Sequence, residues 1–294
     1  MARIISFINL KGGVGKTTLA VATAEILAKE HDKKVLVIDL DPQTNATVLL
    51  ISQEKWKDAN KENRTIHQLF LDLKEDTKAF NIEKSIIKKV SNIGDGIDKL
   101  DLLPSSIDLI DIGDDIAGYN NRQDTMTALK NEIDKKDKEG KTIQENYDYI
   151  LIDCPPNLGA ITMCGVYMSQ YYIIPVLPDT LSTYGLKQVV KKINDKAREI
   201  KRFDEVFDIK PLGVLINRYR NTKSYNVIKN SLMLSSTKKE IPKVFNTIIS
   251  NTTNYADVCD FDEAKTTIRK KYNDFSVLNN FVNEITSRCD EYEK

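Results

Sequence analysis

Apolar and polar positions alternate along the chain with two different periods. Short apolar runs typical of buried strands occur near residues 3–9, 34–40, 100–103, 149–153, 171–177 and 210–216, with a further one near 244–249. Stretches of helical spacing separate them; residues 17–29, for example, place apolar side chains three and four residues apart. This alternation predicts an α/β fold in which helices cover both faces of a mainly parallel, twisted β-sheet.

The first strand pattern is followed by a glycine-rich loop, Lys11-Gly12-Gly13-Val14-Gly15-Lys16-Thr17-Thr18. A strand, a glycine-rich turn and a helix are the context of a phosphate-binding loop, because backbone N–H groups and the helix N-terminus can approach phosphate oxygens there. In such a loop Lys16 reaches the β- and γ-phosphates and the Thr17 hydroxyl binds Mg²⁺. The alternative is a glycine-rich turn before a surface helix. The strict pattern has glycine in place of Leu10, and it has no counterpart of Lys11.

Two further strand patterns end in acidic residues. Asp39 and Asp41 end the run near 34–40, and Asp153 ends the run near 149–153. Open α/β sheets bind ligands at the carboxyl ends of their strands, and an acid there can hold Mg²⁺ directly or through water. A single acid at a strand end is often a helix cap or a turn former. Three acids beside a phosphate loop favour a nucleoside triphosphate site.

The three blocks carry a family resemblance. "KGGVGKTT", "VLVIDLDPQTNAT" and "YDYILIDCPPNLG" resemble the deviant Walker A, A′ and B blocks of the ParA/MinD ATPases, most closely those of ParA-type partition proteins. The stretches "LDLLPSS", "YYIIPVLPDTLSTYGL" and "IKPLGVLINRYRN" extend the similarity over most of the chain. The resemblance implies a P-loop NTPase fold of the deviant Walker A type, with ATP and Mg²⁺ as cofactors.

The resemblance also assigns roles to residues. It implies that Asp41 orients the attacking water, and that Lys11 and Lys16 are the other catalytic residues. It places Thr17, Asp39 and Asp153 at the Mg²⁺ ion. The nucleotide-binding set it implies is Gly12, Gly13, Val14, Gly15, Lys16, Thr17, Thr18 and Asn217. Asn217 is assigned to the adenine edge, although it could equally cap a strand end. The family often has an "IPR" block where this chain has Ile248-Ile249-Ser250-Asn251, so a different adenine pocket is expected.

Lys11 predicts a dimer. In the family this lysine reaches across a subunit interface to the phosphates of the ATP that the other subunit holds. A cation can neutralise charge in a partner's site only when the nucleotides lie between the subunits. The resemblance therefore implies a homodimer bridged by ATP.

The distribution of basic residues bears on nucleic acid binding, since the formal net charge is zero. Residues 187–202 contain seven basic and two acidic residues around the apolar stripe of an amphipathic helix. Such a run alone is typical of a solvated helix face. Partition ATPases, however, bind DNA without sequence preference through their C-terminal half, so the resemblance favours a DNA interface. The candidate contacts are Lys191, Lys192, Arg198, Lys201, Arg202, Arg218, Arg220, Lys238 and Lys239.

The function implied by the resemblance is an ATP-hydrolysing switch for partition of a plasmid or chromosome. The ATP dimer would bind double-stranded DNA non-specifically, and a centromere-binding, ParB-like protein would stimulate a slow hydrolysis. One alternative is a MinD-like membrane switch, which needs a terminal amphipathic helix. The stretch 274–294 has an apolar face, but its final acids would be repelled by anionic lipid, so core packing and no membrane contact are expected. Another alternative is a metabolic P-loop enzyme.

Length and composition complete the prediction. Residues 1–294 are expected to form a single domain, with polar insertions near 52–64 and 131–146 and no N-terminal helix-turn-helix domain. No apolar run of 18 residues and no secretory signal occur, so a cytoplasmic protein, nucleoid-associated when ATP-bound, is expected. The cysteines lack metal-type spacing and are expected to be small buried thiols, which disfavours an iron–sulfur protein: Cys154, Cys164, Cys259 and Cys289.

Overall fold

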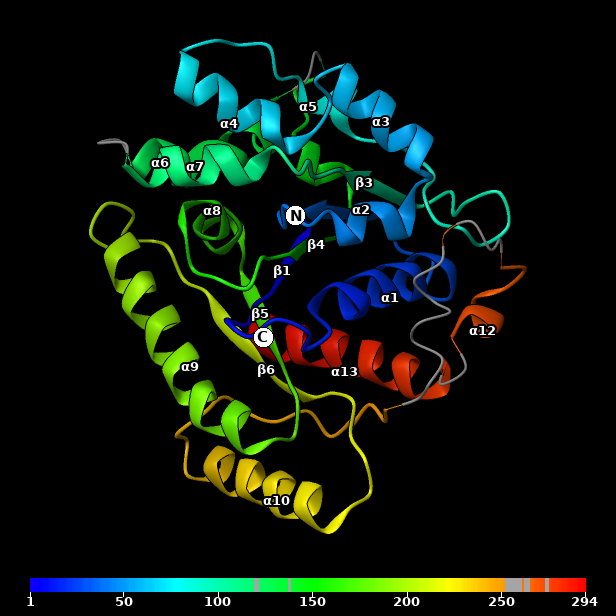
Figure 1. Ribbon diagram of the computed structural model, residues 1–294, viewed down its shortest axis with the longest axis vertical. Coiled ribbons are helices and arrows are strands. Elements are labelled where there is room, and N and C mark those ends of the chain that lie inside the picture. The colour runs from blue at the N-terminus through cyan, green and yellow to red at the C-terminus, as the bar shows by residue number, and fades with distance from the viewer. Residues whose placement is uncertain (119–121, 137–138, 252–260, 262–264, 273–274) are drawn as a thin grey trace.

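Six parallel strands form the centre of the molecule. The computed structural model describes residues 1–118, 122–136, 139–251, 261, 265–272 and 275–294. The strands are β1 (Arg3–Phe7), β2 (Val35–Asp39), β3 (Leu100–Leu103), β4 (Tyr149–Asp153), β5 (Tyr171–Val176) and β6 (Lys210–Ile216). They lie in one sheet of order β3-β2-β4-β1-β5-β6, and every pairing is parallel (Figure 1). The predicted fold class is confirmed.

Helices cover both faces of the sheet, as Figure 1 shows. One face packs against α1 (Lys16–Lys29), α2 (Asn45–Leu50), α12 (Ile268–Lys271) and α13 (Phe275–Glu293). The other packs against α4 (Ile66–Glu75), α6 (Leu109–Gly118), α7 (Arg122–Ile133), α8 (Ala160–Met168) and α9 (Thr180–Ile200). Helix α10 (Lys223–Thr237) contacts α9 and lies at the lower edge of the view in Figure 1.

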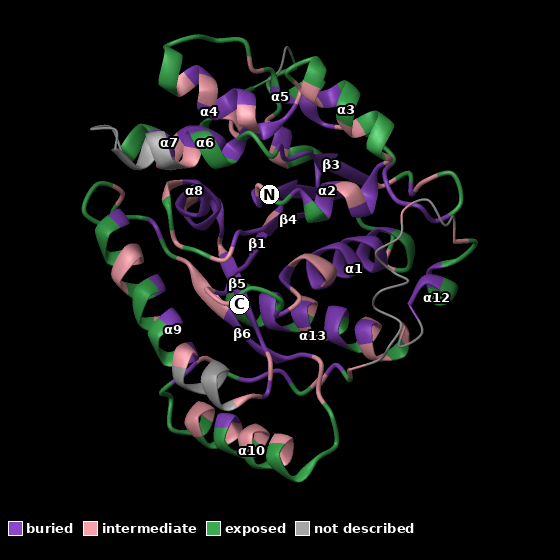
Figure 2. Cartoon of the chain, in the orientation of Figure 1, coloured by how far each residue is buried: buried purple, intermediate pink, exposed green. Residues whose placement is uncertain are grey.

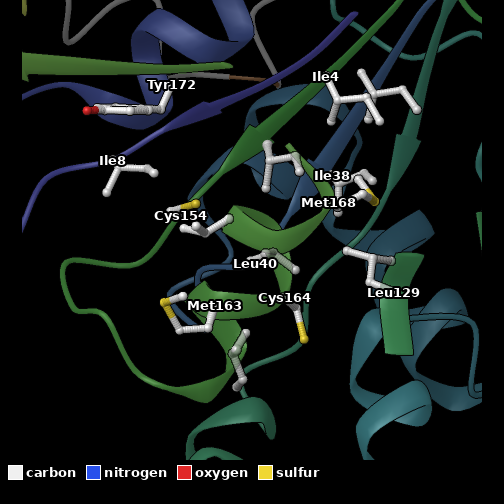
Figure 3. Close-up of a cluster of buried hydrophobic side chains, with 14 of the residues drawn as sticks. Ile4, Ile8, Ile38, Leu40, Leu129, Cys154, Met163, Cys164, Met168 and Tyr172 are labelled. Atoms are coloured by element: carbon white, nitrogen blue, oxygen red, sulfur yellow. The ribbon is translucent and has the colours of Figure 1, made fainter. Parts of the chain in front are cut away.

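Strand side chains explain why both faces are covered. Successive residues of a strand point to opposite faces, so a strand that is apolar throughout needs a partner layer on each side. In β2, Val35 and Val37 belong to the cluster beneath α1, whereas Leu36 and Ile38 belong to the cluster beneath α8. Figure 3 shows part of the second cluster, where Ile38 lies with Met168 of α8 and Leu129 of α7. The sheet is thus buried between two apolar layers.

The two polar insertions form short helices. Residues 52–64 contain α3 (Gln53–Lys61), which begins after Ser52 because the Ser52 side chain accepts a hydrogen bond from the backbone N–H of Lys55. Residues 131–146 contain the end of α7 and a 3₁₀ turn, η1 (Ile143–Asn146). The outer side of α3 is exposed (Figure 2). A further short helix, α5 (Ile82–Ser85), precedes β3.

The strand expected near 244–249 is wrong. This segment bridges the β6 region only at Val244 and Ser250, within the part of the chain that the structure describes. Side chains of α13 bind the backbone groups between these points. Arg288 donates to the carbonyl of Val244 at 2.8 Å, and the Glu284 carboxylate accepts from the N–H groups of Asn246 and Thr247 at 2.9 and 3.1 Å. Because side chains of α13 form hydrogen bonds with these backbone N–H and carbonyl groups, the segment does not pair with β6 as a regular strand.

The apolar face of the C-terminal stretch lies in the core, as expected. Leu278, Phe281, Val282 and Ile285 of α13 are all buried against α1 and the sheet. The side chains that a membrane-binding helix would need are therefore already used in packing. Among the helices of the described ranges, none is both long and apolar enough to cross a bilayer.

The carboxyl edge of the sheet brings distant segments together. Strand β1 lies between β4 and β5. From β1 the chain continues to β2, on the β4 side of β1, and from β4 it crosses to β5, on the opposite side of β1. In register, Asp153 lies opposite both Phe7 of β1 and Asp39 of β2. Because ligands bind at such a change of strand order, the loops that follow β1, β2 and β4 define the candidate site.

Candidate functional site

The glycine loop between β1 and α1 has a conformation that few residues allow. Gly13 and Gly15 have φ of +71° and +92°, in the left-handed region. A Cβ atom on Gly15 would lie 2.3 Å from Nδ2 of Asn217, so a side chain there is excluded. Gly15 also caps α1, and no side chain caps this helix end. The N–H groups at the start of α1 are thus left for an anion.

A cavity of about 350 Å³ opens in front of this helix end. Its lining is Gly12, Gly13, Gly15, Lys16, Thr17, Thr18, Asp41, Gln43, Asn45, Val48, Leu49, Pro156 and Arg218. Most of the predicted nucleotide-binding residues therefore surround one space. Val14 is an exception, because it is buried beneath the loop.

Asp39 is completely buried and fully paired. Its Oδ2 accepts hydrogen bonds from the backbone N–H of Thr47 at 2.8 Å and from the Thr47 hydroxyl at 2.7 Å. Its Oδ1 accepts from the N–H of Asp41 at 3.0 Å. Burial raises the pKa of Asp39 to about 7, although these hydrogen bonds favour the ionised form. The carboxylate thus connects β2 to the start of α2.

Asp153 has the opposite surroundings. It is completely buried, yet neither carboxylate oxygen has a hydrogen-bond partner among the described residues. Burial and then the nearby charge of Asp39 raise its pKa well above the usual value. The Thr17 hydroxyl lies near the carboxylate without forming a regular hydrogen bond to it, and together with the Lys16 ammonium group it favours the ionised form. An unpaired buried acceptor is costly, and a cation would relieve that cost. The carboxylate therefore fits the predicted Mg²⁺ site.

Asp41 lies at the wall of the cavity, 5% exposed. Its Oδ1 accepts a hydrogen bond from the N–H of Gln43 at 3.0 Å, and its carbonyl accepts from the N–H of Thr44 at 2.9 Å. The residue thus begins a tight turn before α2, at the wall of the cavity.

Lys11 is outside the lining of this cavity. Its Nζ lies 2.8 Å from Oδ2 of Asp179, in the segment that follows β5. Both side chains are partly exposed, at 40% and 35%. Lys11 also lines a second cavity of about 430 Å³ with Asn9, Leu10, Gly185, Gln188, Val189 and Lys192. The two lysines of the glycine loop therefore face different spaces.

Asn217, which follows β6, is hydrogen-bonded to the backbone of the glycine loop. Its Nδ2 donates to the carbonyl of Val14 at 2.9 Å, and its Oδ1 accepts from the N–H of Arg218 at 2.9 Å. It is 2% exposed, and the cavity wall at this point is formed by Arg218. Contact between Asn217 and adenine stays a prediction.

The candidate DNA contacts occupy several places. Those on α9 and just after it are exposed, and so are Arg220, Lys238 and Lys239. Arg198 forms an ion pair with Asp195 at 3.1 Å, and Lys201 lies 3.9 Å from Asp208. Arg218 differs from the others because it lines the cavity beside the glycine loop.

The cysteines that the structure describes are buried in the core. Cys154, Cys164 and Cys289 are buried free thiols, as expected, and burial raises the pKa of each. Cys259 lies outside the described residues.

Sequence reasoning missed four residues that shape the site. Thr47 binds Asp39, Ser105 binds the carbonyl of Asp41 and the Thr47 hydroxyl, and Asp179 binds Lys11. Arg218 was assigned to DNA and lines the cavity. Ser105 lies in the block "LDLLPSS", which marked the segment without indicating its contacts. Thr47, Asp179 and Arg218 likewise lie in the quoted blocks "VLVIDLDPQTNAT", "YYIIPVLPDTLSTYGL" and "IKPLGVLINRYRN", which gave no indication of their contacts.

The chain is similar to known proteins over most of its length. A protein-family model described as an AAA domain matches residues 2–205. An uncharacterised protein from Methanocaldococcus jannaschii is 35% identical over 216 residues, which are 74% of this chain and 73% of that protein. The sporulation initiation inhibitor protein Soj from Bacillus subtilis is 32% identical over 66% of this chain. The match spans 65% of Soj, just under two thirds of its length.

Solved structures share the fold. A complex of a Cyanothece McdA variant with ATP superposes with a TM-score of 0.70 at 19% identity, covering 97% of this chain and 96% of McdA. A plasmid partition protein from Borrelia burgdorferi gives a TM-score of 0.64 at 21% identity, covering 97% of this chain and all of that one (100%). At these identities the similarity concerns the fold.

Proposed function

The chain belongs to the AAA-domain family of ParA/MinD-type ATPases, and on that premise we propose that it is an ATP-hydrolysing switch for DNA partition. The observation that carries the proposal is the unpaired Asp153 carboxylate beside an uncapped, glycine-rich helix end, because together they need a cation and an anion. ATP with Mg²⁺ supplies both.

Of the three residues that the resemblance places at the Mg²⁺ ion, Thr17 and Asp153 would hold it, because both oxygens of Asp39 already accept hydrogen bonds. The ion neutralises charge on the phosphates when it is bound. Nowhere in the described ranges do three or more Asp, Glu, His or Cys side chains gather as a metal site. The cation site therefore depends on phosphate oxygens, which would couple Mg²⁺ binding to nucleotide binding. Lys16, 6% exposed at the start of α1, reaches the phosphates.

Asp41 orients the attacking water, since its carboxylate lies at the wall of the same cavity. Catalysis by positioning and charge neutralisation predicts slow intrinsic turnover, which a centromere-binding partner would accelerate. Replacing Asp41 by Ala is expected to trap the ATP-bound state, with hydrolysis reduced at least tenfold and ATP binding retained.

Lys11 acts across the dimer interface. Its place outside its own phosphate cavity suits this role, and in the dimer its partly exposed ammonium group would exchange the ion pair with Asp179 for the phosphates of a partner's nucleotide. Lys11→Ala is expected to abolish ATP-dependent dimers, measured by sedimentation with ATP, with ADP and without nucleotide. Wild-type dimerisation of this variant would contradict the proposed switch.

The deciding experiment is binding to random-sequence duplex DNA in those three nucleotide states, each over a salt titration. Binding that requires ATP and weakens steeply with salt is expected, because phosphate contacts release counterions. Anionic vesicles serve as the parallel surface. Binding to vesicles in place of DNA would contradict the partition role and favour a membrane switch; binding to neither would also contradict it.

A further inference from the structure

A closed ring of hydrogen bonds surrounds the backbone of Asp41. Asp39 accepts from the N–H of Asp41 at 3.0 Å and from the Thr47 hydroxyl at 2.7 Å. The Thr47 hydroxyl oxygen accepts from the N–H of Ser105 at 3.0 Å. The Ser105 hydroxyl returns to the carbonyl of Asp41 at 2.8 Å. The ring joins the end of β2, helix α2 and the segment after β3.

The ring lies in a dry environment. Asp39, Thr47 and Ser105 are completely buried, and Asp41 is 5% exposed. Hydrogen bonds that are shielded from water are electrostatically stronger, and a complete network rigidifies its members. The ring therefore restricts the position of the Asp41 backbone.

The turn that the ring holds is strained. Thr44, three residues after Asp41, has φ of +56°. A β-branched residue in the left-handed region costs free energy and persists only where surrounding contacts hold it. The N–H of Thr44 donates to the Asp41 carbonyl, which also accepts from Ser105. Strain of this kind is typical of a catalytic loop held in one geometry.

Asp39 and Asp153 thus differ in what their oxygens can do. Both oxygens of Asp39 are used by donors of the protein, whereas both oxygens of Asp153 lack partners in the described part of the chain. We propose that Asp39, Thr47 and Ser105 are positioning residues that hold Asp41 in place for hydrolysis. This inference rests on the proposed function of Asp41.

Trp56 supplies an optical reporter of the ring. Its indole N–H donates to the carbonyl of Ser105 at 3.1 Å, and it is the single tryptophan of the chain. Its emission therefore senses the segment after β3. A change in emission on addition of ATP and Mg²⁺ is expected in the wild type, because the bound nucleotide changes the electrostatic surroundings of Asp41, which the ring joins to Ser105.

Ser105→Ala tests the ring with one hydroxyl removed. The turnover number for ATP is expected to fall about 2- to 13-fold, as for the loss of one hydrogen bond, while the dissociation constant for ATP changes less than about twofold. Ser169→Ala is the matched control, because it removes a buried hydroxyl that bonds Ser6 and Gly165, away from the site. Equal losses in both variants would overturn the positioning role.

Replacements of Thr47 give a second test, which can be made even if Ser105→Ala folds poorly. Thr47→Val removes the hydroxyl and keeps the shape, and it is expected to lower turnover and to reduce the ATP-induced change in Trp56 emission. Thr47→Ser restores the hydroxyl and should recover both. Failure of the serine variant to recover turnover above the valine variant would overturn the proposal.

Combining Ser105→Ala with Asp41→Ala separates positioning from general damage. If Ser105 acts through Asp41, its replacement causes no further loss in the Asp41→Ala background. A full additional loss would overturn the inference. If Asp41→Ala alone has wild-type turnover, the proposed role of Asp41 and the positioning role of the ring are both overturned. If Asp41→Ala abolishes hydrolysis but Ser105→Ala and Thr47→Val leave turnover unchanged, only the positioning role of the ring is overturned.

Discussion

Two buried acids on neighbouring strands show how strongly the surroundings decide what one residue type does. Asp39 and Asp153 are in register and equally buried, yet one is saturated with donors and the other has none among the described residues. The free energy cost of the second acid is large in the absence of a ligand. A bound cation would relieve this cost.

Asp153→Asn is expected to stabilise the nucleotide-free protein. Because the folded-state pKa of Asp153 is raised, the carboxyl favours folding below its usual value near 3.8, and that contribution is lost as the pH rises through the raised pKa. At pH 8 the variant should gain about 1–3 kcal/mol, because the buried amide carries no charge that must be desolvated. At pH 5 the gain should be smaller.

Urea unfolding without nucleotide or divalent cation, at pH 8 and pH 5, measures this difference. Asp58→Asn on the exposed face of α3 is the control and should change nothing at either pH. A variant that is less stable than the wild type at pH 8 would refute the assignment of Asp153 as an unpaired acid. Added ATP with Mg²⁺ should stabilise the wild type more than the variant.

The ion pair of Lys11 with Asp179 competes with any contact that Lys11 makes to a partner. Asp179→Asn is expected to promote ATP-dependent dimers, lowering the midpoint concentration about two- to fivefold, since a partly exposed pair contributes about 0.2–1 kcal/mol. Sedimentation over a protein dilution series measures the midpoint. Asp195→Asn, which removes the exposed pair with Arg198, is the control. Weaker dimers of Asp179→Asn would contradict the competition.

At the scale of elements, a buried ion pair fastens α12 to α1. Glu25 of α1 and Lys271 of α12 are fully buried with their charged atoms 2.7 Å apart. Ser91 and Tyr272 donate further hydrogen bonds to the Glu25 carboxylate, at 2.5 and 2.6 Å. The carboxylate is therefore satisfied by three side chains from two segments that are distant from α1 in the chain.

Lys271→Ala is expected to destabilise the fold by about 3–5 kcal/mol, because it leaves the Glu25 charge buried without its counterion. The exposed neighbour supplies the control: Lys270→Ala should change the free energy of unfolding by no more than about 0.5 kcal/mol. Denaturant unfolding measures both. Similar small effects of the two replacements would show that the pair is not the link between α1 and α12.

At the scale of the whole molecule, charge is distributed unevenly over a chain whose formal net charge is zero. Exposed lysines and arginines lie along α9 and at the end of α10, on helices that contact each other. Phosphate contacts depend on such local clusters rather than on the net charge.

Replacing Lys191 and Lys192 together by Ala is expected to weaken ATP-dependent DNA binding and to reduce the slope of log affinity against log salt by about 1.8, since each lost phosphate contact removes about 0.9. The pair Lys55 and Lys57 on exposed α3, replaced in the same way, should leave the slope unchanged. An unchanged slope in the α9 variant would place the DNA contacts elsewhere.

Local patterns predicted much of the fold and the outline of the site. Alternating apolar periods gave the six strands and the two-sided burial, and the glycine loop before α1 was recognisable because its residues are consecutive. The strand near 244–249 failed because its backbone groups bond to Arg288 and Glu284 of α13, about 40 residues further along the chain.

The sequence by itself determined those features that depend on neighbours in the chain: strand and helix periods, the glycine-rich loop between a strand and a helix, and acids at strand ends. Tertiary structure alone decided which acid is paired, which loop Asn217 supports, and that Lys11 and Lys16 face different cavities. The reason is physical. Burial and hydrogen-bond partners arise where strands with distant sequence positions end at one edge, and no local pattern encodes that meeting.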